Sequence, residues 1–177
     1  MAASSIRVFR AAALVAAAAL AGGQAVADEP AGAGARGAVT NMPLPRFVSM
    51  RAETANARRG PSLNHRVDWT FQRRGLPLEV TAEYGNWRRV RDAEGAGGWV
   101  HYTLLSGVRT ALVGGPGPAP LRADAAEDAA IRAFAEPGVV ARLEACAAEW
   151  CRVSAEGVTG WAPRGALWGV GPQETIE

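Results

Sequence analysis

Few side chains in this sequence are of the types that perform covalent catalysis or bind metals. The chain has two cysteines, Cys146 and Cys151, and two histidines, His65 and His101, among its 177 residues. A Cys–His pair would indicate a nucleophilic hydrolase, and a larger Cys/His cluster a zinc site. The cysteine spacing is not Cys-x-x-Cys, and neither histidine is near the cysteines in sequence. These residue types therefore favour a structural role for the cysteines.

The N-terminal residues have the pattern of a secretory signal peptide. Arg7 and Arg10 precede an apolar run that is too short to cross a bilayer as a helix, and Ala25-Val26-Ala27 has the small residues of a cleavage site. We expect cleavage after Ala27 and a mature chain that is periplasmic or secreted. No second long apolar run follows, so we expect no integral membrane segment in the mature chain.

Export favours a disulfide between the two cysteines, because exported chains meet an oxidising compartment. Cys146 and Cys151 also stand at the two ends of a predicted hairpin turn, where opposed residues come within bridging distance. We therefore predict a structural disulfide, which would leave no thiol for catalysis. The histidines lack a clustered carboxylate or thiolate partner, so we expect no metal site, no cofactor and no enzymatic activity.

One sequence pattern occurs twice in the chain. Residues 71–107 and 134–169 align at an offset of 63, which becomes 62 after a one-residue deletion. Such self-similarity is typical of a duplicated structural unit. The matched pairs include Phe71 with Phe134, Gly75 with Gly138, Val80 with Leu143, Trp87 with Trp150 and Val90 with Val153.

The alignment also relates the cysteines to a charged pair. Cys146 matches Glu83, and Cys151 matches Arg88. We therefore expect an exposed cross-strand ion pair in the first unit where the second unit has a disulfide.

The distribution of short apolar runs and turns indicates the fold class. Such runs alternate with glycine-containing turns, which is typical of an all-β barrel or sandwich. A Gly/Pro-rich stretch between the two units has the composition of an extended linker. The predicted organisation is a signal peptide (1–27), a flexible segment (28–45), a first domain (46–112), a linker (113–122), a second domain (123–170) and a C-terminal tail (171–177).

The first unit contains an Asn-x-Arg-x-Gly-Pro motif, a Trp-x-x-Val hairpin strand and a Gly-Trp-Val strand. These are Asn56, Arg58, Gly60 and Pro61, then Trp87 with Val90, then Gly98-Trp99-Val100. With these motifs, the first unit resembles the bacterial SH3-like domains of exported proteins. The second unit resembles a diverged copy, in which the Asn-x-Arg-x-Gly-Pro opening is missing and Pro163 replaces His101. The resemblance implies two small SH3-like β-barrels in tandem. Such domains usually bind or target partners in the cell envelope, often cell-wall peptide or peptidoglycan.

Aromatic and arginine side chains of the first unit are the candidate ligand-binding residues. Strict alternation places Trp87 on one face with Arg89 and Arg91, opposite Val90. Trp87 therefore either turns inward at a bulge and caps the core, or lies on a partner-facing surface. The candidate site consists of Trp69, Tyr84, Trp87, Arg89, Arg91 and Tyr102.

The charge distribution is uneven between the two units. All basic residues are arginine; residues 46–110 hold eleven Arg and six acids, whereas residues 122–177 hold five Arg and nine acids. The basic surface either binds an anionic partner or docks on the acidic unit. We expect non-catalytic binding of peptidoglycan or of an envelope protein or peptide, and no nucleic acid. The alternative is a structural protein with docked barrels, and a cell-wall hydrolase is the least supported class.

Overall fold

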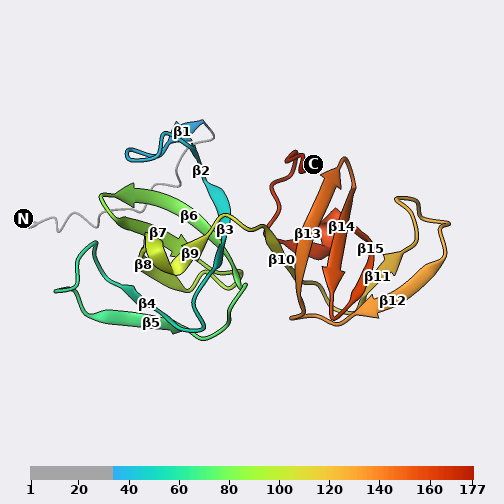
Figure 1. Cartoon of the computed structure of the whole chain (residues 1–177), viewed down its shortest axis with the longest axis horizontal. Helices are drawn as coiled ribbons and strands as arrows, with labels where there is room; N and C mark the ends of the chain where they lie inside the picture. Colours follow the sequence, from blue (N-terminus) through green and yellow to red (C-terminus); the bar gives the residue numbers. More distant parts are fainter. Residues whose placement is uncertain (1–33) are drawn as a thin grey trace, which may run out of the picture.

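The structure, a computed structural model, describes residues 34–177 and contains two seven-stranded antiparallel sheets. Figure 1 shows them side by side, joined by one short connection. A third, two-stranded sheet precedes them in the chain. The all-β class with two SH3-like barrels in tandem is therefore confirmed. The predicted signal peptide, residues 1–27, lies outside the described residues.

Strands β3 to β9 form the first barrel. Their order in the sheet is β5-β4-β8-β7-β6-β3-β9, and a single 3₁₀ turn, η1, precedes β9. The elements are β3 (Arg46–Met50), β4 (Ala55–Arg58), β5 (Val67–Phe71), β6 (Pro77–Tyr84), β7 (Trp87–Arg91), β8 (Gly97–His101), η1 (Tyr102–Leu104) and β9 (Leu105–Ser106).

Strands β10 to β16 form the second barrel in the same order, β12-β11-β15-β14-β13-β10-β16. Both barrels have a β-bulge in the long central hairpin and another in the first hairpin, at corresponding places. The elements are β10 (Thr110–Val113), β11 (Ala119–Arg122), β12 (Ile131–Ala135), β13 (Val140–Ala147), β14 (Trp150–Ala155), β15 (Val158–Pro163), η2 (Arg164–Ala166) and β16 (Leu167–Trp168).

Each barrel has its own hydrophobic core, built from the inward positions of alternating strands. Leu78, Val80 and Val90 are fully buried in the first barrel, and Val113 and Val153 in the second. Full burial of such a side chain stabilises the fold by roughly 1.5–3 kcal/mol.

The structure corrects one detail of the repeat alignment. Phe71 is buried, whereas Phe134 is 62% exposed. Phe71 pairs with Ala55, the first residue of β4. The equivalent residue Ala119, the first of β11, pairs with Ala135 and not with Phe134. The offset is therefore 64 in the first hairpin and becomes 63 only at Gly75 and Gly138, because the second unit has one residue fewer in the connecting turn.

The boundary between the domains differs from the prediction. Thr110–Val113, expected in the first domain and the linker, is strand β10 of the second sheet, where it pairs with β13 and β16. Ala119–Arg122, expected in the linker, is strand β11. The second barrel therefore begins at Thr110, because backbone pairing requires these residues to complete its sheet.

Both flanking segments are ordered where the structure describes them. Residues 34–45 were expected to be flexible, but β1 (Ala35–Arg36) and β2 (Pro43–Leu44) pair as a hairpin. In the predicted C-terminal tail, Ile176 exchanges two backbone hydrogen bonds with Cys146 of β13. Both corrections have the same cause: long-range hydrogen bonds hold segments whose composition predicts little burial.

The two barrels contact one another through aromatic and hydrogen-bonding groups. The rings of Phe47 and Trp168 meet edge to face, with centroids 5.2 Å apart. The guanidinium of Arg109, which directly precedes β10, lies 5.9 Å from the centre of the Phe47 ring and adds a cation–π contact. Hydrogen bonds run from Arg73 to the Gly138 carbonyl (2.6 Å) and from the Thr110 hydroxyl to the Gly75 carbonyl (2.7 Å).

Candidate functional site

A groove of about 580 Å³ lies on the first barrel between the β4–β5 loop and the outer face of β7 and β8. Its size is within the range of small-molecule and peptide sites. Trp87 and His101, which are register partners on neighbouring strands, form one wall. The lining residues are Ser62, Leu63, Asn64, Trp87 and His101. We call this cavity the first-barrel groove.

The loop wall of the groove is held from below by Arg58. Its guanidinium donates to the carbonyl oxygens of Leu63 (3.2 Å) and His65 (2.8 Å). At the base of the loop, Arg59 and Arg66 both bind the Asp68 carboxylate, at 3.0 and 2.5 Å, and the hydrogen bond from Arg59 is the main cause of the lowered pKa of Asp68. The loop is therefore a fixed wall, with the Leu63 side chain exposed at its tip.

The opposite wall continues a row of aromatic rings. The Trp87 and His101 rings meet edge to face at 5.5 Å, and His101 lies 5.1 Å from the ring of Tyr102. Tyr84 stands opposite Trp87 in the strand register and is 66% exposed. The His101 Nδ1 is 2.8 Å from the Thr103 hydroxyl, which orients the imidazole.

The structure selects between the two interpretations of Trp87. Arg88 and Val90 point inward and are buried, so Trp87, Arg89 and Arg91 stand on the outer face. The bulge in this hairpin lies beyond Arg89 and leaves Trp87 outside. Trp87 thus lies on the outer surface of the barrel and does not cap its core.

The predicted site residues are brought together only in part. Tyr84, Trp87 and Tyr102 gather at the same end of the barrel. Arg91 lies at the other end of β7, where it binds Glu79, and Arg89 is opposite Trp99 midway along the strand. Trp69 belongs to the edge strand β5, which β4 and β8 separate from β7.

The candidate site predicted from the sequence does not include Ser62, Leu63, Asn64 or His101, all of which line the groove. The signal that could have found them is the long loop opened by Gly60-Pro61, because long loops over a rigid sheet often carry binding residues.

A buried ionic cluster supports the hairpin that carries Tyr84 and Trp87. The predicted pair of Glu83 and Arg88 exists, with Arg88 Nε 3.5 Å from the carboxylate, but both side chains are buried, not exposed. Arg88 also donates to the Gly85 carbonyl in the turn, at 2.9 Å, and its guanidinium lies 6.0 Å from the centre of the Tyr102 ring. The pair therefore fixes the turn from inside the barrel.

Glu83 also fastens the β1–β2 hairpin to the barrel. Its carboxylate accepts hydrogen bonds from both the backbone and hydroxyl of Thr40, from the Val39 amide at 3.0 Å and from Arg46 at 2.6 Å. Burial raises the pKa of this carboxyl, but the bonds from Thr40, Arg46 and Val39 outweigh burial and lower the pKa from 4.5 to about 2.

The second barrel has no counterpart of this aromatic row. Trp150 occupies the position of Trp87, but Pro163 replaces His101. Arg164 replaces Tyr102: in each barrel this residue's amide donates to a carbonyl in the central turn, and Arg164 is buried. The aromatic row is therefore specific to the first barrel.

The loop-bracing arginine does have a counterpart. Arg122 matches Arg58 at the offset of 64, and its guanidinium donates to the Ala129 carbonyl at 2.8 Å. Arg58 and Arg122 also pair with the matching Trp99 and Trp161. This equivalence is hard to predict from the sequence, because the rest of the loop motif is absent from the second unit.

The two cysteines form the predicted disulfide. Cys146 and Cys151 are register partners in the β13–β14 hairpin, with Cα atoms 4.1 Å apart, and both are fully buried. Neither sulfur is a thiol, so a Cys–His nucleophile cannot form from these residues. Among residues 34–177, no three His, Cys, Asp or Glu side chains gather as a metal site, and no helix there is long and apolar enough to cross a bilayer.

Comparison with known sequences defines the class of protein. The chain matches the family described as Bacterial SH3 domain twice, over residues 51–107 and 115–169. These matches together cover more than half of the chain. The protein therefore belongs to the bacterial SH3 domain family and carries two copies of the domain.

Comparison with individual proteins adds little. A search of curated proteins gives no match. Two solved structures, NlpC2 and NlpC1 from Trichomonas vaginalis, are each 12% identical to this chain, with TM-scores of 0.33 and 0.32. The aligned regions cover 70% of this chain and 48% and 45% of those chains, so this chain spans less than half of their length. Likeness at this level carries no argument about function.

Proposed function

We propose that this protein is an exported, non-catalytic binding module of the bacterial cell envelope, and that its first barrel binds cell-wall peptide in the first-barrel groove. The observation that carries the proposal is the groove itself, in which a braced loop faces Trp87 and His101. Membership of the bacterial SH3 domain family supports a binding role, because such domains often bind the cell wall.

The chemistry of the groove suits an extended peptide. The Trp87 ring and the exposed Leu63 side chain offer apolar surface to methyl and methylene groups. Asn64 and the His101 ring line the same groove and supply polar groups for the carboxylates and amides of wall peptides. Wall peptide combines both features, because it carries small apolar side chains and free carboxylates.

Two further observations support export without catalysis. The signal-peptide pattern ending at Ala27 directs the chain to an oxidising compartment, and the buried disulfide is the bond that such a compartment favours. The disulfide also removes the thiols that a Cys–His wall hydrolase would need.

Sedimentation with purified sacculi tests the proposal. Wild type should pellet with sacculi, and Trp87→Ala should weaken binding tenfold or more, since loss of one well-packed aromatic side chain costs at least about 1.4 kcal/mol. The matched control is Trp150→Ala, the equivalent position in the second barrel, which should bind as wild type does. If wild type stays in the supernatant, the wall-peptide proposal is wrong. If an envelope protein binds wild type but not Trp87→Ala, the ligand of the groove is that protein and not wall peptide.

A second candidate function is a structural component whose two barrels act as one rigid unit. The contact between Phe47 and Trp168 favours this candidate. The structural candidate makes two predictions. Trp87→Ala should bind every envelope fraction as wild type does, and Phe47→Ala should reproduce the phenotype of a deletion strain.

A further inference from the structure

The C-terminal segment, residues 171–177, lies along the edge of β13 in the second barrel. Ile176 and Cys146 exchange two backbone hydrogen bonds, at 2.9 and 3.1 Å, which is the pattern of an antiparallel bridge. The first half of β13 pairs with β10 on this side, and the segment fills the edge where β10 has ended. An edge of this kind offers unpaired backbone groups to another segment.

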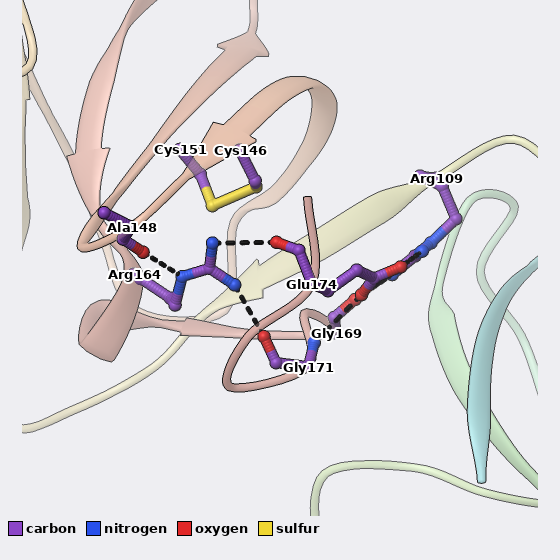
Figure 2. Close-up of a disulfide and its surroundings, with 8 residues drawn as sticks. All are labelled: Arg109, Cys146, Ala148, Cys151, Arg164, Gly169, Gly171 and Glu174. Carbon is purple, nitrogen blue, oxygen red and sulfur yellow. Dashed lines mark hydrogen bonds and ion pairs between the residues drawn. A yellow bond between two sulfur atoms is a disulfide. The ribbon is translucent and has the colours of Figure 1, made fainter. Parts of the chain in front are cut away.

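Two arginines of the barrel bind the same segment (Figure 2). Arg109 binds the Glu174 carboxylate with both terminal nitrogens, one of them at 3.0 Å, in a bidentate arrangement. Arg164 donates to the carbonyl oxygens of Gly171 (2.6 Å) and Glu174 (2.8 Å), and its Nε donates to Ala148 of the barrel. Gly171 and Glu174 are the ends of one turn: the Glu174 amide donates to the Gly171 carbonyl at 3.2 Å, and the Gly171 amide donates to the Glu174 carboxylate at 2.9 Å. The segment is thus recognised through the backbone of this turn and one carboxylate.

These contacts can be supplied by another peptide of the same kind. Apart from the Glu174 carboxylate and the Ile176 side chain, which packs on the barrel core, the contacts are to main-chain atoms that every peptide has. A segment that makes the same turn, with a glutamate at its fourth position and an apolar side chain two residues further on, would reproduce them.

The buried arginine makes exchange the favoured process over simple release. If residues 171–177 left without a replacement, Arg164 would keep its charge in a buried site with two of its donors unpaired. Such a loss costs several kcal/mol. A ligand that brings its own carbonyls and carboxylate avoids that cost.

We propose that the β13 edge, with Arg109 and Arg164, is a docking site for an acidic segment of a partner protein that makes the same turn followed by one antiparallel bridge. In the partner's absence, residues 171–177 occupy this site. This site lies in the second barrel, away from the first-barrel groove, and does not depend on the function proposed for that groove. In the first barrel Arg46, which matches Arg109, is bonded to Glu83, and Tyr102 stands in place of Arg164. The site is therefore specific to the second barrel.

A labelled peptide with the sequence of residues 171–177 tests the proposal by fluorescence anisotropy against full-length proteins. The double substitution Glu174→Ala, Ile176→Ala weakens the occupant without changing β13 or the arginines. It should bind the peptide at least tenfold more tightly than wild type, because the attached segment competes at an effective concentration on the order of millimolar. Adding Arg109→Ala to that variant should weaken binding about tenfold, and a peptide with Gln in place of its first Glu should show the same loss.

Further measurements keep the test decisive. Trp87→Ala should leave peptide binding unchanged, so failure of the groove proposal and failure of this one are distinguishable. In wild type, the Ile176 amide should exchange with solvent at least tenfold faster than the amides between β13 and β14. Equal peptide affinity for wild type and the weakened variant, exchange of Ile176 as slow as the barrel core, or a dimer formed by swapped segments would overturn the proposal.

Discussion

Replacing Glu83 with glutamine should uncouple the N-terminal hairpin from the first barrel in a pH-dependent way. The side chain is fully buried and accepts bonds from Thr40, Val39 and Arg46, and it also faces Arg88. Glutamine keeps the shape but removes the charge, and its NH₂ group cannot accept the bonds that one carboxylate oxygen accepts. Two arginines then lose their buried counter-charge.

The size of the effect follows from the pKa of Glu83. Lowering that pKa from 4.5 to about 2 on folding corresponds to roughly 3 kcal/mol of stability. Because the pKa is lower in the folded state, the contribution is complete above pH 4.5 and is lost as the pH falls toward 2. Glu83→Gln should therefore lower the free energy of unfolding by about 3 kcal/mol at pH 7 and by less than about 1 kcal/mol at pH 2.

Urea denaturation of both proteins between pH 7 and pH 2, followed by circular dichroism, measures this difference. The other carboxylates titrate in both proteins, so their contributions cancel in the comparison. Glu144→Gln is the matched control, because Glu144 forms an exposed pair with Arg152 at 3.3 Å; it should change stability by less than about 1 kcal/mol at every pH. A Glu83→Gln effect that is the same at pH 7 and pH 2 would refute the reasoning.

The remaining predictions concern the second barrel and the contact between barrels. Cys146→Ala with Cys151→Ala should cost roughly 2 kcal/mol of unfolding free energy, the chain-entropy value for so short a loop, and addition of reductant should then have no further effect on the variant. Phe47→Ala should separate the barrels and raise the radius of gyration measured by X-ray scattering, because it removes the ring contact with Trp168. Moderate salt should leave the radius of gyration of wild type unchanged, since ring and hydrogen-bond contacts dock the barrels. Expansion of wild type by salt alone would contradict this.

Most of the fold could be predicted from the sequence, because the repeat shows directly in matched tryptophans and glycines. Alternation along residues 87–91 also placed Trp87, Arg89 and Arg91 on one face, and the structure confirms it. The predicted register of the cysteines is confirmed as well. Cys146 is opposite Cys151 in the second barrel, as Glu83 is opposite Arg88 in the first.

The flanking segments could not be predicted, because local composition does not determine them. Residues 35–44 have no apolar stripe, and they are ordered by a carboxylate that is distant in sequence, Glu83. From its sequence, strand β10 could equally be the last strand of the first unit or the first strand of the second. The groove joins Leu63 of one loop to His101 of a later strand, and only tertiary structure brings them together.

The most direct test of the central claim is an NMR titration of the full-length protein with soluble cell-wall peptide. The account predicts saturable shifts of the Trp87 indole, the His101 ring and the Leu63 methyl groups, with the Trp150 indole unmoved. Shifts confined to the second barrel, or no shifts at millimolar peptide, would contradict it.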